Sequence, residues 1–279
     1  MTEKSKTIRK HYEASKKDSA LVVSVKQLLQ KMGDGPLTSA QLAGLDQFQG
    51  GGLEMTSNFI KLLKIAKEMQ VLDAGSGLGG PSRFAAEHYG CQVMGVDLVS
   101  SFVAVAQLLA ERVGMNRNVS YQVGNLMGLD LPDEHFDVVY TQHVVMNIPD
   151  RTRVYSELRR VLKPGGTFGF YDALATDGKP APHYPVPWAE HGNQSALLTE
   201  AETRDVLKRV GLRVTMWKDV TSEVVQWADV RRLLAPQADT PGPNLKLVMG
   251  ERLGQMSTNF ERNLREEKVR LVMATTTRS

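Results

Sequence analysis

The stretch that most constrains the fold is residues 71–80, which read Val-Leu-Asp-Ala-Gly-Ser-Gly-Leu-Gly-Gly. The apolar residues at its start are typical of the end of a buried strand. The glycines that follow adopt positive φ without strain and let the backbone approach a ligand that a Cβ would exclude. Pro81 then stands where the first turn of a helix tolerates a residue without an N–H. The stretch predicts a strand–turn–helix unit with a ligand over the N-terminus of the helix.

One acidic residue indicates which ligand fits this turn. Asp73 precedes Gly75 by two positions. The dinucleotide fingerprint places its glycines against a pyrophosphate, and a carboxylate in the loop would repel a phosphate and attract an ammonium group. A tight turn that binds nothing remains an alternative. The sequence therefore favours a ligand with a positive amino group.

Strand-like and helix-like segments alternate through the middle of the chain. Such alternation is typical of a parallel sheet with right-handed crossovers. The chain is expected to form an α/β fold with a doubly wound, mostly parallel, seven-stranded sheet. The strands are predicted at 70–74, 92–97, 119–123, 136–141, 167–172, 212–220 and 268–275, and the helices between them at 81–89, 100–113, 151–162 and 199–210. A turn at 163–166 is expected to end the third of these helices.

The remaining segments predict the domain organisation. An N-terminal helical lid is expected over 1–54, with a helix at 16–32 and a glycine run at 50–52 that is either a linker or part of the lid. The proline-rich segment 173–196 predicts an active-site flap, because loops of this length are usually functional or disordered. The predicted core comprises residues 55–221 and 266–279. Between its two parts, a helical cap is expected over 222–265, with helices at 222–235 and 245–265.

The composition excludes several classes of protein. The net charge of +3 over 279 residues gives no reason to expect nucleic acid as a partner. No apolar run reaches the roughly 20 residues of a membrane span, and the first 20 residues contain no apolar stretch typical of a signal peptide. A cytoplasmic location is therefore expected. With Cys91 as the single cysteine and no metal-ligand spacing, neither a disulfide nor a metal site is predicted.

The predicted sheet gathers polar residues at one edge, because the carboxyl ends of parallel strands meet there. Asp97 ends the second strand about 20 residues after the glycine turn, the position of an acid that accepts hydrogen bonds from a ribose. Residues 124–126 follow the third strand and residues 141–143 the fourth. This order of groups fits a ligand with an amino-acid end, a ribose and a base. S-adenosylmethionine is such a ligand.

These motifs resemble those of a known family. Residues 71–80, Asp97, residues 124–125 and the turn at 162–166 together resemble a class I S-adenosylmethionine-dependent methyltransferase. Residues 51–56 are similar to the loop ahead of the core in phosphoethanolamine, sarcosine and dimethylglycine N-methyltransferases and in plant quinone and tocopherol methyltransferases. The resemblance implies a Rossmann-like methyltransferase fold, S-adenosyl-L-methionine as cofactor and a small-molecule methyl acceptor.

The resemblance also implies which residues bind the cofactor. It places Gly75 and Gly77 at the methionine end and Asp97 at the ribose. Asn125 replaces the acid that is more common at the adenine position, and its carbonyl oxygen can still accept from an exocyclic amine. The full set implied is Gln49, Asp73, Gly75, Gly77, Asp97, Leu98, Asn125, Leu126, Thr141 and Gln142.

The catalytic residues depart from the family pattern. In phosphoethanolamine methyltransferases a histidine lies about four residues beyond the fourth strand, where this chain has Asn147, and His143 falls where they have an acid. Phosphoethanolamine is therefore doubtful as a substrate. An amine nucleophile must be neutral to attack, so His143 is the first candidate for a base, with Asn147 and Tyr12 as further catalytic candidates. The predicted substrate-binding residues are His143, His183, Tyr184 and Trp188.

Several functions remain as hypotheses. Methyl transfer to an amine nitrogen is preferred, and O- or C-methylation of a phenolic, quinone or prenyl metabolite is the alternative. Outside this class, an NAD(P)-dependent oxidoreductase would use the same type of sheet, although Asp73 and the glycine spacing argue against it. A homodimer is a further hypothesis.

Overall fold

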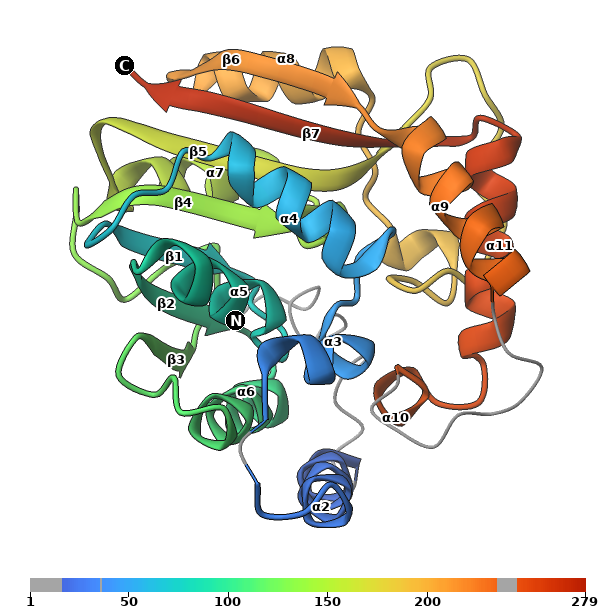
Figure 1. The fold of residues 1–279 in the computed structure, drawn as a ribbon. Coiled ribbons are helices and arrows are strands. Elements are labelled where there is room, and N and C mark those ends of the chain that lie inside the picture. Colours follow the sequence, from blue (N-terminus) through green and yellow to red (C-terminus); the bar gives the residue numbers. More distant parts are fainter. Residues whose placement is uncertain (1–16, 36, 235–244) are drawn as a thin grey trace.

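The computed structural model describes residues 17–35, 37–234 and 245–279, and its strands form one sheet (Figure 1). The strand order is β3-β2-β1-β4-β5-β7-β6, and β7 runs antiparallel to both of its neighbours, β5 and β6. The predicted doubly wound, mostly parallel, seven-stranded sheet is confirmed. The strands are β1 (Gln70–Ala74), β2 (Gln92–Asp97), β3 (Val119–Val123), β4 (Phe136–Gln142), β5 (Leu162–Ala175), β6 (Leu212–Asp219) and β7 (Val269–Arg278).

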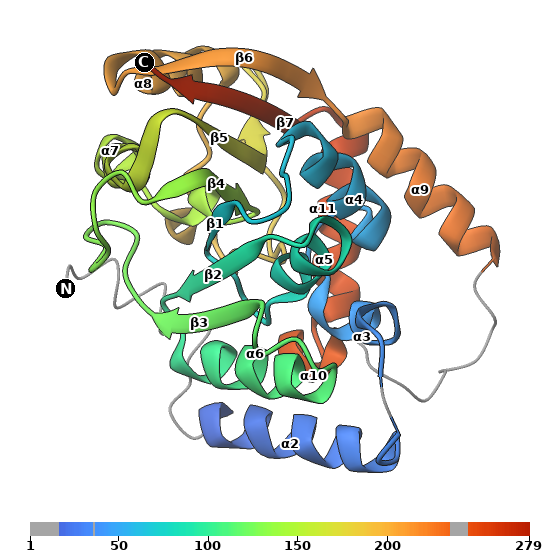
Figure 2. The ribbon, with the colours of Figure 1, turned by 60° about the vertical axis from the view of Figure 1, so that its left-hand side comes forward.

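Helices cover both faces of the sheet, because the strands are apolar on both sides. One core cluster joins the sheet to α4 (Gly52–Leu62), α5 (Gly80–Tyr89) and α6 (Ser100–Arg112). A second cluster, on the opposite face, joins it to α7 (Arg151–Val161) and α8 (Glu200–Arg209). Outside the first layer lie α2 (Lys17–Lys31) and α3 (Ser39–Asp46), and Figure 2 shows α2 alongside α6.

Three further helices lie beyond the carboxyl ends of the parallel strands. These are α9 (Thr221–Leu234), α10 (Lys246–Met249) and α11 (Leu253–Arg265), and α9 and α11 stand beyond the arrowheads of the parallel strands in Figure 1. The predicted continuous helix at 245–265 is wrong. It is interrupted at Gly250, whose φ of +73° ends α10.

Two other details differ from the expectation. The structure assigns 163–166 to strand β5 and not to a separate turn. The register on β4 nevertheless jumps there, from Leu162 opposite Phe136 to Thr167 opposite Val138, so these residues form an irregular bulge. The sequence analysis also missed α3. Its signal was a capping box, in which the side chains of Thr38 and Gln41 each bond the other's backbone N–H.

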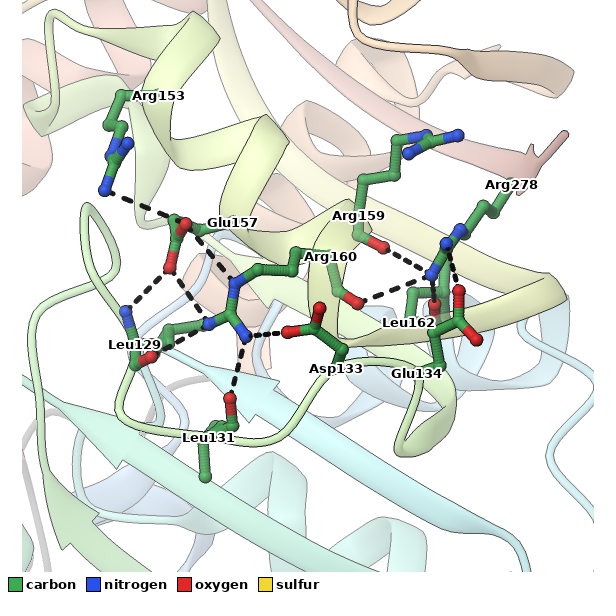
Figure 3. A network of polar contacts seen from close by, with 10 residues as sticks. All are labelled: Leu129, Leu131, Asp133, Glu134, Arg153, Glu157, Arg159, Arg160, Leu162 and Arg278. Carbon is green, nitrogen blue, oxygen red and sulfur yellow. Dashed lines mark hydrogen bonds and ion pairs between the residues drawn. The ribbon is translucent and has the colours of Figure 1, made fainter.

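A polar network closes the edge of the sheet opposite the carboxyl ends of the parallel strands (Figure 3). Arg160 donates to the carbonyl oxygens of Leu129 and Leu131 and pairs with Asp133 at 2.5 Å and Glu157 at 3.1 Å. Arg278 donates to Leu162 O and pairs with Glu134. Arg160 thus links the β3–β4 loop to α7, and Arg278 links the end of β7 to the start of β5.

A buried ion pair joins the outer helices to the core. Arg83 of α5 and Asp46 of α3 lie 2.5 Å apart, and both side chains are essentially inaccessible to solvent. Arg83 also donates to Leu78 O at 2.9 Å. Burial raises the pKa of Asp46 to about 6, even though the arginine beside it favours the carboxylate. This pair holds the segment before α4 against the helix that follows the glycine turn.

We expect Arg83→Met to lower the free energy of unfolding by about 3–5 kcal/mol, because it leaves the Asp46 carboxylate buried without its cation. Urea unfolding at pH 7.5 measures the change. The double variant Asp46→Leu, Arg83→Met should recover part of the loss. Arg209→Met, which breaks the exposed pair with Asp205, is the control and should change stability by less than about 1 kcal/mol. Equal losses in Arg83→Met and in the double variant would contradict this account.

Candidate functional site

A pocket of about 840 Å³, part of it open to solvent, lies where β1, β2 and β4 end. One part of its wall is apolar, and its polar groups come from the residues that follow these strands. It is lined by Phe48, Gly75, Gly77, Asp97, Leu98, Val99, Phe102, Asn125, Leu126, Met127, Gln142, His143, Val144, Asn147 and Ile148. Nine of these are residues that the sequence predicted for the site.

Hydrogen bonds fix the glycine turn to the end of β2. Gly75 N donates to Val96 O at 2.7 Å, and Gly77 N donates to Asp97 Oδ2 at 2.8 Å. The other carboxylate oxygen of Asp97 accepts from Val99 N at 2.9 Å. Burial raises the pKa of Asp97, and these N–H donors act against that rise. Asp97 therefore shapes the turn and also borders the pocket.

Position 75 requires glycine for two reasons, its positive φ and the lack of room for a Cβ. Its φ of +92° lies in the region that favours glycine, and a Cβ at this position would overlap the side chain of Val144. Val144 follows β4, so the ends of β1 and β4 approach each other closely at this point. The glycine thus allows two walls of the pocket to meet.

Asp73 lies beneath the turn and does not line the pocket. Its Oδ2 accepts from Ser82 Oγ at 2.5 Å, and burial raises its pKa to about 7. The carboxyl group thus joins the end of β1 to the first turn of α5. A direct contact with the cofactor, as predicted from the sequence, is not supported by this position.

His143 stands at the polar end of the pocket in an unusual backbone conformation. Its φ is +53°, and its N–H donates to Tyr171 O at 2.7 Å. Its ring packs edge-on against Tyr171, with 4.6 Å between the centroids. Nε2 is buried and has no hydrogen-bond partner among the described residues. Burial lowers the pKa of His143 to about 3, so the imidazole is neutral at physiological pH.

The other candidates from β4 and the lid occupy different positions. Gln142 lines the pocket, while Thr141 and Gln49 are buried outside its lining. Asn147 lines the pocket and donates its amide to Trp188 O at 2.7 Å. Tyr12 lies outside the described residues.

The aromatic flap residues pack against the protein and do not line this pocket. Trp188 is buried, donates to Ser195 Oγ at 3.0 Å and stacks edge-on against Phe260. His183 Nε2 lies 2.8 Å from Glu266 Oε2, and Tyr184 is half-buried against the core. Their predicted role in substrate binding stays a prediction.

Asn125 and Leu126, the predicted adenine contacts, line a part of the pocket wall that is mainly apolar. Asn125 Oδ1 accepts from Met127 N at 3.0 Å, which leaves its second lone pair for a ligand. The sequence analysis missed the apolar members of the lining. These are Phe48, Val99, Phe102, Met127, Val144 and Ile148. Four of them directly follow a predicted site residue, which was a usable signal: Val99, Met127, Val144 and Ile148. Phe102 lies about one helical turn after Leu98, and Phe48 comes from the segment before α4.

The fold is Rossmann-like, as in solved methyltransferase structures. Residues 72–170 match the family model of a methyltransferase domain, Methyltransf_11. This part of the chain is therefore similar to a methyltransferase domain, as the motifs predicted. The match contains the glycine turn, Asp97, the strand β4 and His143 directly after it.

Curated relatives extend the comparison. A sterol 24-C-methyltransferase of Gibberella zeae is 41% identical over 109 residues, which cover 39% of this chain and 29% of that protein. The phosphoethanolamine N-methyltransferase of Triticum aestivum is 29% identical over 177 residues, or 63% of this chain and 34% of that protein. This chain thus spans about a third of the length of these two relatives. The phosphoethanolamine N-methyltransferase of Plasmodium falciparum is 24% identical, over 81% of this chain and 83% of its own.

Solved structures share the fold at low sequence identity. The geranyl diphosphate C-methyltransferase of Streptomyces coelicolor A3(2) has a TM-score of 0.66 and 17% identity, over 81% of this chain and 80% of its own. Phosphoethanolamine N-methyltransferase 2 of Haemonchus contortus has a TM-score of 0.69 and 18% identity, over 86% of this chain and 57% of its own. The cyclase SpnF has a TM-score of 0.62 and 18% identity, over 91% and 92%.

We expect Gly75→Ala to destabilise the protein by about 1–3 kcal/mol more than Gly165→Ala. Both glycines have positive φ, but a Cβ at Gly165 meets nothing within 4 Å, so that variant measures backbone strain alone. Thermal or urea unfolding measures both losses. Adding Val144→Ala to Gly75→Ala should recover the steric part. If Gly75→Ala and Gly165→Ala lower the free energy of unfolding equally, the close approach of β1 and β4 does not determine the residue at position 75.

Proposed function

We propose that the chain is an S-adenosylmethionine-dependent methyltransferase that methylates a small molecule at an amine nitrogen. The observation that carries this proposal is the pocket itself, with the β1 glycine turn and the Asp97 carboxylate on one side and His143 on the other. The methyltransferase domain match at 72–170 supports the same reaction class and gives no support to an oxidoreductase.

The residues of the pocket fit this cofactor. Asp97 has lone pairs left for ribose hydroxyls, and the apolar wall that includes Phe102, Leu126 and Met127 suits a flat base. Gln142 Oε1 is buried without a partner among the described residues, as is His143 Nε2, so both can accept hydrogen bonds from ligands. When bound, S-adenosylmethionine supplies a methyl group activated by a positive sulfur.

His143 orients the acceptor in this proposal. A neutral imidazole with a pKa of about 3 is too weak a base to hold a proton taken from an ammonium group. The amine therefore enters in its neutral form, and Nε2 accepts a hydrogen bond from its N–H. The lone pair on the amine nitrogen is then available for in-line attack, and much of the rate comes from this positioning. After transfer the surplus proton leaves to solvent.

A carbon acceptor is the second candidate. The relative in Gibberella zeae is named as a sterol C-methyltransferase, and it shares 41% identity over 109 residues with this chain. The apolar part of the pocket is compatible with a prenyl or sterol-like acceptor. An oxygen acceptor on a phenol or quinone remains the third choice.

The proposed activity can be tested with S-adenosylmethionine that carries a labelled methyl group. The fold alone does not show methyl transfer, because SpnF shares it and is named a cyclase. The panel of acceptors should contain primary to tertiary amines, phosphoethanolamine, phenols, and prenyl and sterol alcohols. Label transfer to an amine supports the proposal. Binding of S-adenosylhomocysteine without label transfer to any class would contradict methyl transfer.

We also consider the location of the protein and its oligomeric state. No described helix is long and apolar enough to cross a membrane. The cytoplasmic location and the homodimer stay predictions.

Asp97→Ala should weaken the binding of S-adenosylhomocysteine by about tenfold or more, because charge-assisted hydrogen bonds to the ribose are lost and the turn loses its anchor at Gly77. Isothermal titration calorimetry measures the dissociation constant. Asp219→Ala is the control, since Asp219 is a surface residue near Arg270 and lies outside the pocket lining. Unchanged affinity in Asp97→Ala would contradict the proposed hydrogen bonds between Asp97 and the ribose.

His143→Ala should lower kcat by about tenfold or more and leave the affinity for S-adenosylhomocysteine close to that of the wild type, because the orienting hydrogen bond is lost. In the wild type, kcat should show no acidic limb near pH 6.5, since His143 stays neutral down to about pH 3. His88→Ala, which alters a histidine stacked on Phe84 away from the pocket lining, is the control. A limb near pH 6.5 that disappears in His143→Ala would show that His143 titrates as a base.

A further inference from the structure

A buried side-chain network links the segment before α4 to the end of β4. Thr56 Oγ1 donates to Gln47 Oε1 at 2.7 Å and accepts from Gln142 Nε2 at 3.1 Å. It also accepts from Gln49 Nε2, which bonds Gln47 Oε1 as well. The four side chains are buried, and Thr56 is completely inaccessible to solvent.

The hydroxyl group of Thr56 determines which end of the Gln142 amide faces it. A hydroxyl has one donor and two acceptor lone pairs. Its proton is used by Gln47, so it can only accept from Gln142 and Gln49. Gln142 must therefore turn its NH₂ group toward Thr56. Its Oε1 is then left buried without a partner among the described residues.

Strand register places this oxygen beside the glycine turn. Asp73 of β1 lies opposite Tyr140 of β4, so Gln142 comes level with Gly75. Both residues line the pocket. The proposed ribose contact, Asp97, is the last residue of the neighbouring strand β2 on the other side of β1. The Gln142 oxygen thus lies at the end of the pocket that the proposed cofactor would fill with its amino-acid part.

We infer that Thr56 is a positioning residue, which orients the Gln142 amide so that Oε1 accepts a hydrogen bond from the ammonium group at the cofactor's amino-acid end. This inference rests on the proposed function. Without the Thr56 hydroxyl, the NH₂ group of Gln142 loses its buried acceptor. The amide can then turn over and present a donor to the ammonium group, which repels it.

The test compares two ligands by calorimetry. S-adenosylhomocysteine has the amino-acid end, and 5′-methylthioadenosine has the same nucleoside without it. Thr56→Val should weaken S-adenosylhomocysteine binding by about tenfold, since a hydrogen bond to a charged group is lost, and leave 5′-methylthioadenosine binding unchanged. Thr56→Ser keeps the hydroxyl and should bind both ligands like the wild type. Thr203→Val is the matched control, because it removes another buried helical hydroxyl away from the pocket lining.

Two results would overturn the inference. One is wild-type affinity for S-adenosylhomocysteine in Thr56→Val, and the other is an equal loss for both ligands, which indicates a general loosening of the pocket. If Thr56→Val does not fold, Gln142→Leu is measured in its place. It should likewise weaken the binding of S-adenosylhomocysteine and leave the binding of 5′-methylthioadenosine unchanged. Failure of the proposed function is distinguishable, because the wild type itself would then bind neither ligand or would bind S-adenosylhomocysteine but transfer no labelled methyl group to any acceptor.

Discussion

The pocket depends on the attachment of the glycine turn to the end of β2. Gly75 N bonds Val96 O, and Gly77 N bonds the carboxylate of Asp97. Backbone groups of the turn are thereby satisfied within the protein, as buried polar groups require. The turn is held open beside Asp97, and α5 begins directly after it with its N-terminus near the pocket. Phe48 and the end of β4 then complete the pocket.

Local sequence was enough to predict the sheet and the strand-borne part of the site. Alternating strands and helices, with glycines and prolines between them, define the doubly wound order, and the ends of its parallel strands must converge. Gly77, Asp97 and His143 could be placed together for this reason. The antiparallel position of β7 between β5 and β6 was not predicted, because no local pattern in the chain indicates the direction of its last strand.

The contacts that cover the site could not be predicted in this way, because they join residues far apart in the chain. Asp46 meets Arg83, and Thr56 meets Gln142, across separations of 37 and 86 residues. No pattern in a single sequence links such pairs. The aromatic flap shows the same limit, since Trp188 could equally face a ligand or pack on α11, where it meets Phe260.

β7 lies between β5 and β6, so this side of the sheet can form only after β7 has been synthesised. β6 pairs with β7 alone among the described strands, and β7 is the last of them in sequence. During synthesis, β6 has no strand beside it until residues 269–278 leave the ribosome, and the edge of β5 is open for the same period. Exposed strand edges bind other strands readily. The nascent chain is therefore vulnerable to aggregation between the synthesis of β6 and that of β7.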